Sequence, residues 1–235
     1  MSYLRLDRLL GNICCLNRND ADKAIRRARV TLNGQVVRTP NAKVDTECDC
    51  VTLDGRELVI RERIYIMMNK PEGVVCSSDG KEKSVYDILP ENMRRKELFT
   101  VGRLDKDTTG LVIITDDGSF VHNAASPKRK VSKQYIATLV EPLTDEMAEK
   151  WRSGMTLADG DVVSPAEVEL LSSDRLKVKI TIHEGKYHQI KRMAGAVSNR
   201  IVTLKRVAIG EILLDDSLEV GECRYLTETE EKVYN

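Results

Sequence analysis

The sequence lacks the features that would place the protein in a membrane or outside the cell. No run of about 18 apolar residues occurs among its 235 residues, so we expect no membrane-spanning helix. The amino-terminal stretch carries charges as early as Arg5 and Asp7, which is unlike a secretory signal peptide. We therefore expect a cytoplasmic protein. The hydrophobic content of 41% is enough for one large domain, or for a small and a medium domain, with real cores.

The cysteine spacing of zinc sites is also missing. Cys14 and Cys15 are adjacent, and Cys48 and Cys50 are one residue apart, whereas zinc knuckles usually have two intervening residues. In a reducing compartment we expect the six cysteines to be free thiols that fill small apolar spaces. The sequence thus predicts no metal site.

The chain has no net charge, but its charges are unevenly distributed. Residues 1–45 hold nine basic and four acidic side chains, and residues 183–206 hold six basic side chains and one acidic one. Residues 211–235 hold eight acidic and two basic side chains, which cancels the sum. Local positive surfaces can bind phosphates, although most charged runs are only solvated faces. The distribution therefore favours a nucleic-acid partner modestly.

Residues 102–111 have the pattern of a catalytic loop. They read Gly-Arg-Leu-Asp-Lys-Asp-Thr-Thr-Gly-Leu, and β-prone apolar runs lie on both sides of them. A loop anchored by two buried strands holds a side chain in a fixed place, which is where catalytic groups tend to lie. Asp105 is therefore the first candidate for a catalytic carboxylate. An ordinary loop salt bridge between Arg103 and Asp105 would explain the same pattern.

This loop resembles the signature loop of pseudouridine synthases that modify bacterial ribosomal RNA. Three further segments match the same family in the expected order. They are residues 69–73 (Asn-Lys-Pro-Glu-Gly), 133–135 (Lys-Gln-Tyr) and 184–193 (Glu-Gly-Lys-Tyr-His-Gln-Ile-Lys-Arg-Met). Four matches in register across about 125 residues argue strongly against chance.

The resemblance implies isomerisation of a uridine in ribosomal RNA without metal, cofactor or energy source. It makes Asp105 the essential catalytic residue, places Tyr135 where its ring can stack on the flipped uracil, and makes Lys191 the cation that pairs with Asp105. The sequence leaves open whether Asp105 acts as nucleophile or base, and whether Arg192 takes the place of Lys191. We interpret His188 as a structural hydrogen-bonding residue. The other expected substrate contacts are basic: Arg103, Arg192, Lys70 in the turn that shapes the pocket wall, and Lys128, Arg129 and Lys130 in a loop.

Residues 1–60 predict a small RNA-binding domain of two helices and a hairpin. Apolar residues at helical spacing in 3–13 predict an amphipathic helix, and Asn19 or Asp20 can cap a second one. The Asn33-Gly34 pair between two β-prone runs predicts the hairpin. This arrangement resembles the small RNA-binding domain shared by a small-subunit ribosomal protein and tyrosyl-tRNA synthetases. Its expected RNA contacts are Arg5, Arg8, Arg26, Arg27 and Arg29.

Residues 61–235 predict a larger catalytic domain after a charged linker near residue 61. Residues 135–140 and 176–182 predict strands, and apolar positions 143, 147 and 151 predict a helix, as does the helical period of 187–197. The order lacks regular βαβ units, which favours an α+β fold built mainly on an antiparallel sheet. The resemblance implies the same architecture.

The resemblance is closest to the branch that modifies small-subunit rRNA. We therefore expect 16S rRNA as the substrate, at the uridine-516 site of the family, in preference to 23S rRNA, whose enzymes share the core motifs. A non-catalytic rRNA-binding assembly factor is an alternative, but such a protein needs no carboxylate in a basic pocket. A glycoside hydrolase-like enzyme normally needs two carboxylates, and Asp107 is the only near candidate for the second. We expect a monomer with no membrane partner.

Overall fold

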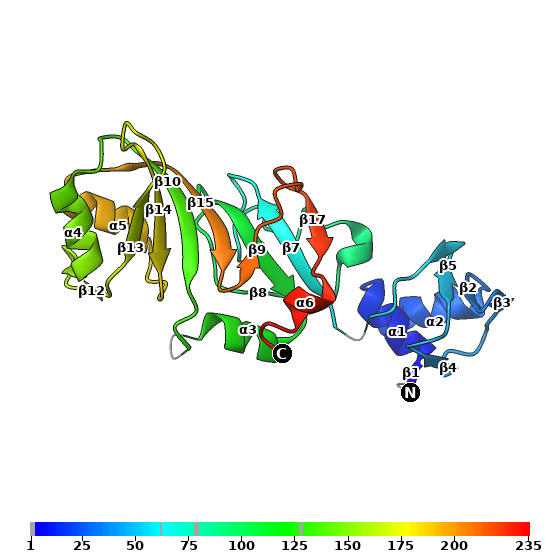
Figure 1. The fold of residues 1–235 in the computed structure, drawn as a ribbon. Coiled ribbons are helices and arrows are strands. Elements are labelled where there is room, and N and C mark those ends of the chain that lie inside the picture. Colours follow the sequence, from blue (N-terminus) through cyan, green and yellow to red (C-terminus); the bar gives the residue numbers. More distant parts are fainter. Residues whose placement is uncertain (1–2, 62, 78–79, 127–128) are drawn as a thin grey trace. The chain divides into compact units, whose positions relative to one another are not determined.

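The computed structural model describes residues 3–61, 63–77, 80–126 and 129–235. The chain divides into two compact units, which Figure 1 shows in colours that follow the sequence. The first unit comprises residues 1–64 with 88–98, and the second comprises residues 65–87 with 99–235. The first unit thus includes residues 88–98, a segment outside the range 1–60 that we assigned to the small domain. The independent folding of residues 1–60 and 61–235 stays a prediction.

Within its described residues, the first unit contains two α-helices and two small sheets. Strand β1 (Tyr3–Arg5) pairs with β4 (Lys43–Asp45), so helix α1 (Leu6–Ile13) begins later than the apolar pattern alone suggests. Helix α2 (Arg18–Arg26) is capped by Asn17, whose side chain accepts a hydrogen bond from the Asp20 amide; Asn19 and Asp20, the expected caps, lie inside the helix. The second sheet has the order β3-β2-β5-β6. Its strands are β2 (Val30–Leu32), β3 (Gln35–Val36), β5 (Val51–Leu53) and β6 (Arg56–Glu57).

Both hairpins of this sheet turn at residues with positive φ. Asn33 and Gly34 have φ values of 51° and 78°, and Asp54 and Gly55 have 52° and 77°, as expected for two-residue turns whose twist matches that of the strands. The apolar faces of α1 and α2 pack on β2, β4 and β5 in one core. A 3₁₀ turn at Glu91–Met93 completes the unit.

The second unit is built on one large sheet with the order β13-β14-β10-β15-β9-β7-β17. Every pairing along this order is antiparallel except that between β15 and β9. The strands are β7 (Tyr65–Lys70), β9 (Thr109–Thr115), β10 (Lys133–Leu139), β13 (Glu167–Leu170), β14 (Lys177–Ile182), β15 (Ile201–Ile209) and β17 (Cys223–Tyr225). β8 (Phe99–Thr100) pairs with β9 and β16 (Ile212–Leu213) pairs with β15, while β11 (Met155–Thr156) and β12 (Val162–Val163) form a separate hairpin. The expected α+β fold with a mainly antiparallel sheet is confirmed.

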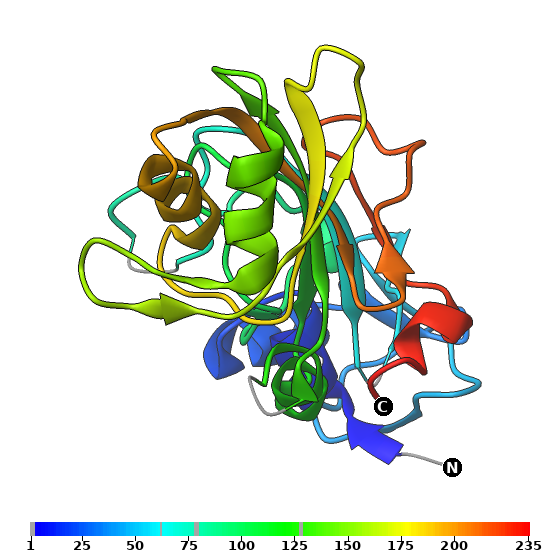
Figure 2. The same ribbon diagram turned by 60° about the vertical axis from the view of Figure 1, so that its left-hand side comes forward.

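Helices lie beside two parts of this sheet (Figures 1 and 2). Helices α4 (Asp145–Ser153) and α5 (Gln189–Ala196) lie side by side near β10, β13 and β14, and the Trp151 indole donates to the Met193 carbonyl at 3.1 Å. Helix α3 (Gly118–Ala125) packs through Phe120 against β7 and β9, and the short α6 (Glu228–Glu231) precedes Tyr234, which joins the same core. None of the helices in the described ranges is long and apolar enough to cross a membrane.

Candidate active site

The Asp105 loop connects two neighbouring strands at one end of the sheet. It leaves the segment that follows β8 and enters β9 at Thr109, and the Thr108 amide donates to the Asp105 carbonyl at 3.1 Å to close a turn. Neighbouring segments hold the loop at two more points. The Gly73 amide donates to the Lys106 carbonyl at 2.8 Å, and the Leu104 amide donates to the Cys76 sulfur at 3.4 Å. The turn therefore presents Asp105 from a fixed backbone.

Two buried cations donate hydrogen bonds to backbone carbonyls in and beside this loop. The Lys70 ammonium, at the end of β7, donates to the carbonyl of Thr108 at 2.8 Å and to that of Lys106 at 3.4 Å. The Arg206 guanidinium, on β15, donates to the Leu111 carbonyl at 2.8 Å and to the Val101 carbonyl at 3.5 Å. Lys70 thus contacts the interior of the loop, and Arg206 contacts Val101, just before the loop, and Leu111, in the strand that follows the Asp105 turn.

The burial of Lys70 corrects our expectation that it contacts RNA. Its side chain is 0% exposed, and its third donor is directed at the Pro71 carbonyl at 3.0 Å. Burial lowers the pKa of this ammonium, and the three carbonyls supply the hydrogen bonds that a buried cation requires. Lys70 therefore positions the loop and does not bind the substrate directly.

Gly110 allows the loop to enter the sheet next to Arg206. It pairs with Arg206 across the parallel strands β9 and β15 and has a φ of 98°. A Cβ atom at this position would overlap the Arg206 carbonyl oxygen and lie 2.9 Å from its backbone nitrogen. Only glycine combines this backbone conformation with such a close approach.

Helix α5 brings the cation to Asp105. Its apolar positions Ile190 and Met193 are buried, as the helical period predicted, which turns the opposite face toward the loop. Gln189 is also buried. Its side-chain Nε2 donates to Glu184 Oε1 at 2.9 Å, and its side-chain Oε1 accepts from the Lys186 backbone amide at 3.0 Å. These bonds fix the first turn of the helix and hence the direction of Lys191.

The structure selects Lys191, and not Arg192, as the partner of Asp105. The Lys191 ammonium lies 2.8 Å from Asp105 Oδ2 and 2.5 Å from Asp107 Oδ1. Partial burial opposes the charge of Lys191, but the hydrogen bonds to the two carboxylates outweigh burial and raise its pKa. The hydrogen bond from Lys191 in turn lowers the pKa of Asp107. His188 Nε2 approaches the other oxygen of Asp105 at 3.4 Å, so both oxygens of this carboxylate face a nitrogen.

Arg192 is held elsewhere. Its guanidinium pairs with Asp159 and lies 2.7 Å from Asp161 Oδ2, both of which belong to the turn between β11 and β12. Asp161 also contacts Lys186 at 3.3 Å. We expected Arg192 to contact phosphate or to replace Lys191 at Asp105. The structure instead makes it a link between α5 and the β11–β12 hairpin.

Tyr135 is placed by strand register. It pairs with Ile180 on one side and with Arg206 on the other, and Arg206 pairs with Gly110, so these four residues form one row across β14, β10, β15 and β9. Directly paired residues share a face of a sheet, so Tyr135 and Arg206 point the same way. The Tyr135 side chain is largely buried. Its stacking on a flipped uracil stays a prediction.

The other predicted RNA contacts lie on the surface, with one exception outside the described residues. Arg103, Arg129 and Lys130 are exposed, and so are Arg8 and Arg27 in the first unit. Three further arginines are exposed but form ion pairs: Arg5 with Asp7, Arg26 with Asp22 and Arg29 with Asp54. Lys128 lies outside the described residues. The roles of these residues in RNA binding stay predictions.

Sequence reasoning missed the part that Arg206 plays and the acidic turn that holds Arg192. Arg206 lies within a β-prone run and looked like one more basic residue of a positive segment. Asp159 and Asp161 carry no motif, and their relation to α5 arises only in the folded chain. The one available signal was spacing, since Arg206 stands two residues from Leu204 and from Ala208, and all three are buried on one face of β15.

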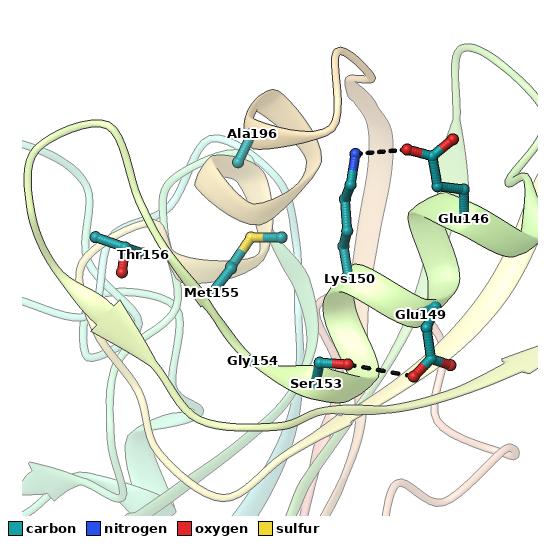
Figure 3. A pocket seen from close by; sticks show the side chains of 8 residues that line it. All are labelled: Glu146, Glu149, Lys150, Ser153, Gly154, Met155, Thr156 and Ala196. Atoms are coloured by element: carbon teal, nitrogen blue, oxygen red, sulfur yellow. Dashed lines mark hydrogen bonds and ion pairs between the residues drawn. The ribbon is translucent and has the colours of Figure 1, made fainter.

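A surface hollow of about 430 Å³ lies between α4, β11 and the end of α5 (Figure 3). Lys150 pairs with Glu146 at 2.9 Å along α4, and Ser153 donates to Glu149 at 3.2 Å. The residues that line it do not include Asp105, Asp107, His188 or Lys191. The hollow is therefore separate from these four residues, which we call the Asp105 group.

Residues 64–196 match the family model described as RNA pseudouridylate synthase. The chain belongs to the RNA pseudouridylate synthase family. The matched range contains Asp105, Asp107, His188 and Lys191 together with Lys70, whereas Arg206 lies beyond it.

Full-length relatives extend the similarity over nearly the whole chain. The ribosomal small subunit pseudouridine synthase A of Vibrio vulnificus is 44% identical over 229 residues, which cover 97% of each chain. The protein of the same name from Escherichia coli K12 is 42% identical over 97% of this chain and 98% of its own length. A crystal structure of a pseudouridylate synthase is 39% identical and superposes with a TM-score of 0.68 over 97% of this chain and 98% of its own. The resemblance drawn from four motifs is confirmed, and this chain is similar to these enzymes through both units.

Proposed function

We propose that the protein isomerises a uridine of small-subunit ribosomal RNA to pseudouridine. The observation that carries the proposal is the Asp105 carboxylate, held by a doubly anchored loop and paired at 2.8 Å with Lys191. The names of the full-length relatives from Vibrio vulnificus and Escherichia coli K12 support small-subunit rRNA as the substrate in preference to 23S rRNA. Within that rRNA, uridine 516 is the finer target that we propose.

The reaction is an isomerisation that needs no external reactant. The bond between N1 of uracil and C1′ of ribose breaks, the base rotates, and a bond forms between C5 and C1′. The proton at C5 is lost, and N1 gains a proton, so atoms and charge balance. Asp105 acts at C1′ as nucleophile or as base on the sugar, Lys191 keeps its carboxylate oriented, and Tyr135 stacks on the flipped base with its oxygen near C5.

The state of Asp107 argues against the hydrolase alternative. Glycoside hydrolysis normally needs one carboxyl group that is protonated at working pH. The hydrogen bond from Lys191 lowers the pKa of Asp107, so this carboxyl is ionised at neutral pH and is a poor general acid. Asp105 and Asp107 both pair with Lys191, and Asp107 is not protonated as a general acid would be.

We assign the first unit to docking on rRNA. Its exposed basic residues, including Arg8 and Arg27, lie on a unit whose two helices and small sheets pack around one apolar core. Phosphate contacts of this kind position an RNA without reading its sequence. The choice of uridine then belongs to the second unit, which holds the Asp105 group.

Mapping of pseudouridine in defined transcripts tests the proposal. Purified protein is incubated with unmodified 16S rRNA, 23S rRNA and partly assembled small subunits, and pseudouridines are located by chemical modification and primer extension. We expect one new pseudouridine, at position 516 of 16S rRNA. Asp105→Asn should abolish it while RNA binding stays nearly intact. Asp145→Asn, which alters an exposed carboxylate paired with Arg175, serves as the matched control. Modification of 23S rRNA alone, or an active Asp105→Asn variant, would contradict the proposal.

A further inference from the structure

Tyr187 is an exposed aromatic ring next to the Asp105 group. Its side chain is 74% exposed, although tyrosines usually bury most of their ring. One face of the ring stacks on His188, with centroids 3.8 Å apart and planes inclined by 19°. Because the stack is so flat and the ring so exposed, the opposite face of Tyr187 is open to solvent.

The stack is connected directly to the reacting carboxylate. His188 Nε2 lies 3.4 Å from Asp105 Oδ1, so a single imidazole separates the Tyr187 ring from the carboxylate. His188 has a φ of 48°, in the left-handed region, immediately before α5. A non-glycine residue held in this conformation indicates that its surroundings fix its orientation.

The backbone of Tyr187 is also held in place. Its carbonyl accepts a hydrogen bond from Arg192 Nη1 at 2.8 Å, and Arg192 is itself bound by Asp159 and Asp161. The exposed ring therefore stands on a backbone that is tied to α5 and, through Arg192, to the β11–β12 hairpin. A preorganised flat surface loses little conformational entropy when a second ring stacks on it.

We propose that the open face of Tyr187 binds an unpaired nucleobase that neighbours the target uridine. This inference rests on the proposed function and adds a second base-binding position to it. The target uracil occupies the position beside Tyr135, and its sugar must meet Asp105. A ring one imidazole away from Asp105 is then within reach of an adjacent nucleotide. Single-stranded RNA is typically recognised by such stacking of splayed bases on aromatic side chains.

Kinetics with RNAs that lack single bases test this inference. The substrate is an RNA fragment with tritium at C5 of the target uridine, since pseudouridine formation releases that tritium to water. Wild-type protein is compared with Tyr187→Ala and Tyr187→Phe on the intact fragment and on fragments with an abasic site one or two nucleotides to either side. Phe99→Ala is the matched control, because Phe99 is 46% exposed and pairs with Thr115, at the end of β9 remote from Gly110.

We expect Tyr187→Ala to raise KM roughly tenfold, the loss typical of one base stack, with kcat within about twofold. Tyr187→Phe keeps the ring and should restore KM. On one abasic fragment the difference between wild type and Tyr187→Ala should vanish, which would identify the stacked base. An unchanged KM overturns the inference, and so does a tenfold penalty that persists on every abasic fragment. A fall in kcat alone would also overturn it, because Tyr187 would then act only by holding His188. Absence of tritium release from wild-type protein would count against the proposed function instead.

Discussion

Replacement of Lys191 by methionine should slow catalysis much more than it weakens RNA binding. Methionine keeps the apolar stem but removes the ammonium that lies 2.8 Å from Asp105 and 2.5 Å from Asp107. A hydrogen bond to a charged group contributes roughly 1.5–3 kcal/mol. The Lys191 and Asp105 side chains are 25% and 29% exposed, so solvent screening favours the lower half of this range. A loss of about 2 kcal/mol at the transition state corresponds to a roughly 30-fold lower kcat.

The assay is single-turnover tritium release from rRNA, with RNA affinity measured separately by filter binding. Lys150→Met is the matched control, since Lys150 forms an ion pair of 2.9 Å with Glu146 on the exposed surface of α4 (Figure 3). Surface pairs of that kind contribute little, so the control should keep its kcat. A second readout is the Asp107 carboxyl carbon in NMR titrations. Its pKa should rise when Lys191 is removed, because the hydrogen bond from Lys191 is what lowers it. Unchanged kcat with weaker RNA binding would refute the reasoning and assign Lys191 to docking.

Two further predictions concern the scaffold. Gly110→Ala should lower the melting temperature sharply or prevent folding, because a Cβ would overlap the backbone of β15. Gly118→Ala is the control and should leave the melting temperature nearly unchanged, because a Cβ there meets nothing within 4 Å. Equal melting curves for the two variants would contradict this account. Burial raises the pKa values of Tyr65 and Tyr234 to about 12, so the unfolded chain ionises first. The free energy of unfolding should therefore be unaffected by these two groups below pH 10. It should fall between about pH 10 and 12, by roughly 2–3 kcal/mol for each tyrosine. Denaturant unfolding at successive pH values measures the loss, and a Tyr65→Phe, Tyr234→Phe double variant that shows the same decline would exclude this origin.

Local patterns predicted the strands and helices well where one period dominates the segment. The alternation of residues 176–182 became β14, and the β-prone run 135–140 largely became β10. Helix α5 buries the apolar stripe that its period predicted. Helix ends were predicted less well, because they depend on distant partners. Residues 3–5 of the expected first helix became β1 through pairing with residues 43–45, a contact that no local pattern contains.

The choice between Lys191 and Arg192 shows where sequence reasoning about the site ends. Lys191 and Arg192 lie three and four residues after His188, so both point to the same side of α5. Helical spacing alone therefore could not decide which of them pairs with Asp105. The separation arises from Asp159 and Asp161, which lie about thirty positions earlier in the chain and bind Arg192 in the folded protein. Because its guanidinium is held there, Arg192 does not reach Asp105. The Lys191 ammonium instead bridges the carboxylates of Asp105 and Asp107.

The roles of Lys70 and Arg206, the buried cations that bind the backbone at the Asp105 loop, also could not be predicted from the sequence. Lys70 and Arg206 are charged residues that a reader of sequence assigns to the surface, yet both are buried and donate to backbone carbonyls in or beside the Asp105 loop. A buried cation is tolerated only where hydrogen bonds compensate for its lost hydration, and here the loop carbonyls supply them. Collapse of the loop would leave two charges buried without partners, so the cost of burying them becomes a restraint on the position of Asp105. The cations of the site therefore have two roles. Lys70 and Arg206 hold the backbone of the loop, and Lys191 orients the Asp105 carboxylate.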